Sequence, residues 1–244
     1  MSNITEQLSS SIDTLTREYE IITHNLANAS TAGFKRRCNT FTKVLNAQQA
    51  NSQTNSAGTT DLNTVFDFSQ GGIVQTSREL DFALSGRGFF VIETPNGPLY
   101  TRNGSFSTDQ NGQLVDSQGR IVAGKAGAIT IPGNIPLSQL YAAEDGSISA
   151  NGVSIGQLKL VDFGDNQSKL VPVGSSCYRM SDAAVDPADA SNVIVKQGFQ
   201  ESSNVQIVEE LVDLVMVTRL YEANMEFLST GRQISNSLMN VAMA

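Results

Sequence analysis

Apolar residues recur at alternating steps of four and three along both ends of this 244-residue chain. This is the a and d spacing of a coiled-coil seam, and polar residues fill the positions between. The pattern predicts a helix from about residue 3 to about residue 28, followed by turn residues that end in Gly33. The N-terminal stripe consists of Leu8, Ile12, Leu15, Tyr19, Ile22 and Leu26.

The C-terminal end predicts a second, longer seam helix. From Ser203 to about Val241 the chain contains no proline and one glycine, Gly231, so about 38 residues or about 57 Å of helix are possible. Two such helices alone bury too little apolar surface to offset the entropy of ordering about 60 residues. We therefore expect the ends to be largely disordered in a single molecule and to fold as a coiled coil on assembly. The C-terminal stripe consists of Ile207, Leu211, Leu214, Tyr221, Met225 and Leu228.

Between the ends, short β-like runs such as residues 89–92 and 99–101 follow one another at close intervals. Asn-Gly pairs separate several of them, as at 111–112 and 151–152, and this dipeptide suits type I′ hairpin turns because both positions tolerate positive φ. The pattern predicts an α+β fold whose central antiparallel β-domain is barrel-like or sandwich-like. We expect four segments: an N-terminal helix and turn in 1–45, a linker in 46–79, the β-domain in 80–200 and the C-terminal helix in 201–244.

The composition argues against several function classes. A net charge of -8 and a pI of about 4.6 disfavour nucleic acids and anionic lipid as partners, since both require a basic surface. The single histidine, His24, has no neighbouring histidine or cysteine, and Cys38 and Cys177 are far apart, which favours two thiols over a zinc site or disulfide. We therefore predict no catalytic, metal or cofactor site, and no enzyme.

A local basic cluster follows the first predicted helix in this otherwise acidic chain. It comprises Lys35, Arg36, Arg37 and Lys43. Cationic residues are common after a helix C-terminus, where they complement its dipole. The cluster therefore predicts either a solvated segment or a surface that pairs with an acidic neighbour in an assembly.

Three sets of segments carry recognisable motifs: residues 25–35, then 80–90 with 100–106 and 111–115, and finally 202–205 with 209–212 and 219–224. In this order they resemble the bacterial flagellar basal-body rod and hook proteins. Room for a single β-domain and a short linker favour a rod protein, of the proximal-rod type over the distal-rod type. The motif residues are Asn25, Leu26, Ala27, Asn28, Thr31, Gly33, Phe34, Gly86, Gly88, Phe89, Tyr100, Thr101, Arg102, Gly104, Phe106, Asn204, Val205, Arg219, Tyr221, Glu222 and Asn224.

The resemblance implies a structural subunit that polymerises helically into the axial drive shaft, which transmits torque from motor to hook. It implies as partners further copies of the chain, other rod, hook or junction proteins, and the flagellar type III export apparatus, without nucleic acid or membrane insertion. It also implies a place in the basal-body rod, in the periplasmic space, after export without a cleaved signal peptide. Residues 1–11 lack the basic and apolar regions of such a signal.

Three alternatives remain at this point. They are a flagellar hook-type protein, a secreted β-domain binding module that coiled-coil arms oligomerise, and a polysaccharide- or substrate-acting β-domain with helical arms, for which the sequence places no acid pair at a cleft. In the rod interpretation Leu15, Ile22, Leu211 and Leu228 anchor the seam. Asn25, Asn28, Thr31 and Gly33 cap the first helix and turn the chain, with Gly33 required if its φ is positive. Arg219, Tyr221 and Glu222 then reach a neighbouring subunit, although Tyr221 equally suits core packing.

Overall fold

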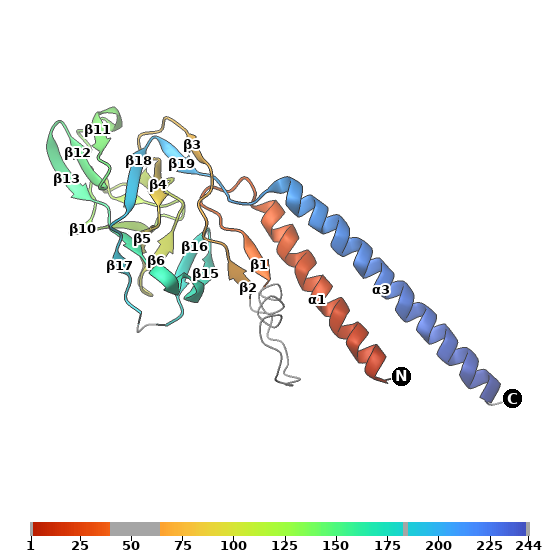
Figure 1. Cartoon of the computed structure of the whole chain (residues 1–244). Helices are drawn as coiled ribbons and strands as arrows, with labels where there is room; N and C mark the ends of the chain where they lie inside the picture. The colour runs from red at the N-terminus through yellow and green to blue at the C-terminus, as the bar shows by residue number, and fades with distance from the viewer. Residues whose placement is uncertain (1, 40–63, 183–184, 243–244) are drawn as a thin grey trace. The chain divides into compact units, whose positions relative to one another are not determined.

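The computed structural model describes residues 2–39, 64–182 and 185–242 of the chain. It confirms an α+β protein with a helix near each end and mainly antiparallel strands between them (Figure 1). The chain divides into two compact units, and residues 66–79 of the expected linker belong to the second of them. The first unit comprises Met1–Ala27, Arg37–Val65 and Val205–Ala244, and the second comprises Asn28–Arg36 and Phe66–Asn204.

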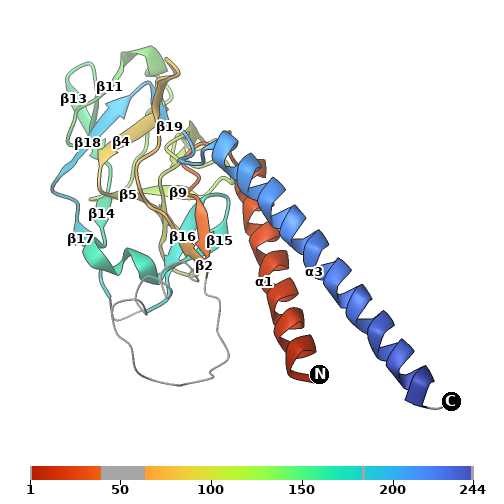
Figure 2. The same cartoon turned by 45° about the vertical axis from the view of Figure 1, so that its right-hand side comes forward.

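Two helices dominate the first unit. Helix α1 (Ser2–Ala27) and helix α3 (Ile207–Ala242) lie side by side and run in opposite directions (Figures 1 and 2). Helix α3 continues through Gly231, because one glycine costs only about 1 kcal/mol relative to alanine and does not by itself end a helix. Strands β1 (Arg37–Asn39) and β2 (Thr64–Phe66) form a two-stranded sheet.

The second unit is built on one large sheet. Its strands follow the order β15-β16-β6-β5-β9-β8-β7, while β10 pairs with β9 and β14 pairs with β5 and β17. Every one of these pairings is antiparallel. The strands are β5 (Phe89–Glu93), β6 (Leu99–Thr101), β7 (Ser107–Thr108), β8 (Leu114–Val115), β9 (Ile121–Gly124), β10 (Gly127–Ala128), β14 (Leu160–Asp162), β15 (Leu170–Gly174), β16 (Cys177–Met180) and β17 (Ala188–Asp189).

Smaller antiparallel sheets complete this unit. Two short 3₁₀ helices, η1 (Leu137–Gln139) and η2 (Gly164–Lys169), precede β11 and β15. The small sheets are β11 (Leu140–Ala142) with β12 (Ser147–Ala150) and β13 (Val153–Gln157), β4 (Phe82–Gly86) with β18 (Val193–Gln197), and β3 (Ile73–Gln75) with β19 (Phe199–Glu201).

The barrel-like form of the expected β-domain is wrong. Within the described residues the path of the large sheet ends at β15 and β7, which do not pair, so the sheet is not a closed barrel. One face of the sheet is covered instead by the small sheets, because buried residues of β4, β11, β12 and β18 join those of β5, β8 and β9 in one cluster. The core is therefore closed by packing between sheets.

Strand β5 is buried on both faces. Phe90 and Ile92 point into the larger apolar cluster, while Phe89 and Val91 point into a second cluster with aromatic residues of neighbouring strands. Successive residues of a strand face opposite sides, so a strand between two cores must be apolar throughout. This explains the uninterrupted apolar run at 89–92.

The Asn-Gly pairs play different roles. Asn151 and Gly152 both have positive φ and join β12 to β13, which confirms a type I′ hairpin turn. The pair Asn103-Gly104 is not such a turn, because neither residue has positive φ. A Cβ at Gly104 would meet the carbonyl oxygen of Phe82 and lie 2.9 Å from the Phe90 ring, so this glycine permits close packing.

The hairpin between β15 and β16 predicts a stabilising substitution. Its two turn residues, Ser175 and Ser176, have φ of 51° and 54°, a left-handed conformation that costs an ordinary residue about 1–2 kcal/mol. We expect Ser176→Gly to raise the melting temperature by about 2–4 °C, as measured by circular dichroism. Ser107→Gly, in the extended strand β7, is the matched control and should lower it; an unchanged or lower value for Ser176→Gly contradicts the turn geometry.

Candidate functional site

One buried side chain ties three elements of the first unit together. Asn25, in the last turns of α1, donates from Nδ2 to the carbonyl oxygen of Arg37 at 2.9 Å and to both carboxylate oxygens of Glu210 at 3.3 Å. Its Oδ1 accepts a hydrogen bond from the Arg37 amide at 2.8 Å. Asn25 and Glu210 are both buried, so the amide fixes β1 and the start of α3 against α1.

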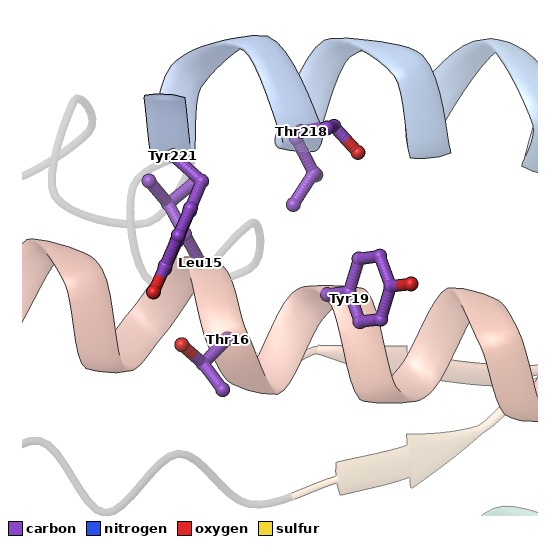
Figure 3. A pocket seen from close by; sticks show the side chains of 6 residues that line it. Leu15, Thr16, Tyr19, Thr218 and Tyr221 are labelled. Atoms are coloured by element: carbon purple, nitrogen blue, oxygen red, sulfur yellow. The ribbon is translucent and has the colours of Figure 1, made fainter. Parts of the chain in front are cut away.

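An apolar groove lies further along the same helix pair. It has a volume of about 220 Å³ and is lined by Leu15, Thr16 and Tyr19 of α1 and by Val217, Thr218 and Tyr221 of α3. Figure 3 shows Tyr221 extending from α3 toward α1 beside Leu15. The groove lies toward the start of α1 and the middle of α3 relative to the Asn25 contact, as antiparallel helices require.

The N-terminal stripe lies largely on the covered side of α1. Ile22 is buried, and Leu8, Ile12, Leu15 and Leu26 are half-buried. Tyr19 lines the groove with 47% of its surface exposed. The spacing of the sequence therefore indicates the face of α1 that meets α3.

The C-terminal stripe is split by the structure. Leu214 and Leu228 are half-buried and Tyr221 lines the groove, whereas Ile207, Leu211 and Met225 are exposed. Four residues that the stripe left out complete the less exposed side of α3: Glu210, Asp213, Val217 and Asn224. Hydrophobic periodicity passed over Glu210 and Asn224 because it counts only apolar residues. The one signal in the sequence for a polar partner was Asn25 itself, a polar residue on the apolar face of the first helix.

His24 lines a mainly polar pocket with Arg17, Glu20 and Arg37. Partial burial, and then the positive charge of Arg37, lower the pKa of this imidazole. Among the described residues no group of histidine, cysteine and carboxylate side chains is arranged to hold a metal ion.

The second unit contains a buried ionic triad. Lys35, Arg102 and Glu201 are all buried, and Glu201 accepts from Lys35 Nζ at 2.6 Å and from the Arg102 guanidinium at 3.3 Å. Lys35 also donates to the carbonyl oxygen of Ser69, and Arg102 to that of Gly86. Burial lowers the pKa of both Lys35 and Arg102, and the Glu201 carboxylate acts against that shift. Glu201 is therefore the carboxylate that pairs with both buried cations.

Backbone contacts join the segment after α1 to the segment before α3 within this unit. The amide of Gly33 donates to the carbonyl oxygen of Glu201 at 2.7 Å, and that of Arg36 donates to Asn204 Oδ1 at 2.7 Å. Gly33 has φ of +66°, and a Cβ there would lie 2.6 Å from the carbonyl carbon of Arg102. Only glycine combines this conformation with so close an approach.

The other motif residues are distributed over both units. Thr31 donates from its amide to the carbonyl oxygen of Asn28 in the turn after α1. Thr101 donates from Oγ1 to the carbonyl oxygen of Ser176. Arg219 and Glu222 are exposed on α3. Five apolar motif residues are buried: Phe34, Phe89, Tyr100, Phe106 and Val205. Leu26 is half-buried and Ala27 is exposed. Gly86 has positive φ, and Gly88 lies next to Ala190 and Val193.

The two thiols lie in different units. Cys38 is half-buried in β1, and Cys177 is buried in β16, where the guanidinium of Arg120 donates to its Sγ at 3.1 Å. No disulfide joins the described residues. Burial raises the pKa of the Cys177 thiol, which keeps it protonated and unreactive.

Removal of the shared carboxylate tests the triad. We expect Glu201→Gln to lower the unfolding free energy of the second unit by about 3–5 kcal/mol, because it leaves two buried cations facing a neutral amide. Urea titration followed by tyrosine fluorescence measures the change. Glu93→Gln, at an exposed position of β5, is the control and should change the free energy by less than about 0.5 kcal/mol. Equal stability of the two variants contradicts the role of the triad.

Comparisons with known proteins agree with the sequence motifs. A family model of the flagellar hook protein FlgE/F/G D1 domain matches residues 83–153, and one of the flagellar basal body rod FlgEFG protein C-terminal region matches residues 196–241. Within the described residues, no helix combines the length and the apolar character that a membrane crossing requires.

Several relatives align over nearly the whole chain. The flagellar basal-body rod protein FlgG of Buchnera aphidicola subsp. Schizaphis graminum is 34% identical over 89% of this chain and 91% of its own length. FlgF of Caulobacter vibrioides is 31% identical over 92% and 91%, and FlgG of Bacillus subtilis is 30% identical over 91% and 92%. These names favour the rod over the hook and the secreted binding module. The chain therefore belongs to the flagellar basal-body rod proteins of the FlgF and FlgG type, and it is a structural subunit of the rod, not an enzyme.

Proposed function

We propose that this rod subunit polymerises helically with further copies of itself into the axial shaft that transmits torque from the motor to the hook. The supporting observation is the exposed apolar surface of α3. A monomeric protein rarely leaves so continuous an apolar surface in water, and such surfaces mark sites of protein association. Among the described side chains of this helix, the large apolar ones that are exposed are Ile207, Val208, Leu211, Val212, Val215, Met216, Leu220, Tyr221, Met225 and Phe227.

In this proposal α1 and α3 form the coiled-coil layer of each subunit. The covered side of α3 includes Leu214, Val217 and Leu228. Their separations of three and eleven residues place them at positions a, d and a of a heptad repeat. The buried amide of Asn25 opposite Glu210 then sets the register of the pair, as a single polar residue does in other coiled coils. Neighbouring copies supply the remaining contacts that stabilise the helices.

Further features of the proposal rest on family membership. The partners are other rod, hook or junction proteins and the flagellar type III export apparatus. The subunit lies in the periplasmic part of the rod and is exported without signal cleavage. A proximal-rod position stays a prediction, since relatives named FlgG and FlgF are both similar to this chain.

Charge placed in the seam tests the proposed function. We expect Ile22→Asp to abolish sedimentable polymer and swimming, because it buries a carboxylate between α1 and α3 while leaving the second unit folded. Ultracentrifugation and motility assays report assembly, and hydrogen exchange of the β5 amides reports the folding of the second unit. Ser11→Asp, exposed on the same helix, is the control and should assemble normally. Normal swimming by bacteria that carry only Ile22→Asp would refute the seam.

Loss of the Asn25 hydrogen bonds should weaken assembly less than Ile22→Asp does. Asn25→Ala leaves the buried Glu210 carboxylate and the Arg37 backbone without these hydrogen bonds, at a cost of about 1–3 kcal/mol. The concentration needed for polymerisation should rise by about 5-fold to 150-fold. Ser10→Ala, exposed on α1, should leave it unchanged. If Asn25→Ala polymerises at the same concentration as the unmodified chain, the Asn25 hydrogen bonds do not contribute to assembly.

A further inference from the structure

Helix α3 carries two exposed apolar stripes that α1 does not cover. Stripe A consists of Val208, Leu211, Val212 and Val215, and stripe B consists of Met216, Leu220, Ala223 and Phe227. The large side chains of both stripes are between 45% and 75% exposed. At 3.6 residues per turn, the stripes point away from the side that bears Leu214 and Val217. The helix therefore has three apolar faces and one intramolecular partner.

The two stripes match in spacing at three positions each, while Leu211 and Phe227 both correspond to Arg219 at the same offset. Positions 208, 212 and 215 of stripe A are separated by four and three residues, and positions 216, 220 and 223 of stripe B repeat these steps eight residues later. Eight residues of α-helix correspond to a rise of about 12 Å and a rotation of about 80° beyond two full turns. A second α3 that is parallel and displaced by about 12 Å can thus place its stripe B against stripe A.

We propose that stripe A of one copy packs against stripe B of the next copy, so that parallel α3 helices are staggered by about eight residues along the shaft. This inference rests on the proposed polymerisation and specifies the contact. Because the two stripes differ, the interface is heterologous, and repetition of one such contact generates an open helical array and leaves all copies pointing the same way along the axis.

The surface of α1 argues for α3 as the occupant. Among the described side chains of α1, Tyr19 is the one large apolar residue that is classed as exposed. The outer side of α1 instead presents Asp13, Arg17 and Glu20. Such a face suits water and does not complement an apolar stripe. The exposed apolar positions of α3 that repeat the spacing of 208, 212 and 215 are those of stripe B at 216, 220 and 223, on another copy of the helix.

Cysteine cross-linking tests the stagger. One protein carries Val212→Cys with a size tag and the other carries Leu220→Cys, both with Cys38→Ser. We expect the mixed polymer to form a tagged–untagged disulfide on mild oxidation, because positions 212 and 220 face each other between copies. The pair Val212→Cys and Ser229→Cys is the matched control, since Ser229 is exposed on α3 outside both stripes and should not link.

A charge exchange gives a second, independent measurement. Val212→Glu and Leu220→Lys should each raise the concentration for polymerisation by about tenfold, because each places a charge in an apolar contact. The double variant should recover part of the loss, since the new carboxylate of one copy meets the new amine of the next. Ser229→Glu should have no effect.

The outcomes separate the stripe contact from polymerisation itself. If the unmodified chain polymerises, three results overturn the stripe contact alone. These are cysteine variants that form no 212–220 link, cysteine variants that link 212 to 212, and additive losses in the charge-exchanged double variant. A link from position 212 to a different protein in isolated basal bodies, without a link to a second copy, also overturns it. Failure of the unmodified chain to form any polymer would instead contradict the proposed function.

Discussion

The account depends on one constraint: among the described residues, α3 exposes two apolar stripes that α1, its one helical partner in that part of the chain, does not cover. Helix α1 covers the side that bears Leu214 and Val217, and many large apolar residues stay exposed on the other sides. A helix that is apolar all round is stable when other elements surround it. In the proposed polymer those elements are other subunits, so the arrangement favours assembly over a solitary molecule.

Buried polar groups determine which arrangement is adopted. In the first unit Asn25 contacts Glu210, and in the second unit Glu201 serves both Lys35 and Arg102. Such groups add little stability compared with apolar residues of equal size, but each tolerates only an arrangement that supplies its partner. We infer that the Asn25–Glu210 contact fixes the register of the helix pair. The triad fixes the pairing between the segment that contains Gly33 and the segment that contains Asn204.

Much of the fold was predictable from periodicity and turn chemistry. Both helices, the antiparallel β-domain and the type I′ turn at Asn151 follow from spacing and from the conformational preferences of asparagine and glycine. The apolar stripe of α1 was readable because polar residues surround it. The stripe of α3 was harder to read, because apolar residues lie on several sides of this helix. The structure buries Val217, which the predicted stripe left out, on the same side as Glu210, the partner of Asn25. The triad was also hidden, since Lys35, Arg102 and Glu201 are far apart in the sequence.

Hydrogen exchange measured by mass spectrometry on the dilute chain and on its polymer tests the central claim most directly. The account predicts that amides of α3 exchange rapidly in the dilute chain and become protected in the polymer, while amides of β5 and its neighbouring strands are protected in both. Strong protection along the whole of α3 in the dilute chain, with no further gain in the polymer, would contradict it. In that case α1 alone would suffice to stabilise the helix.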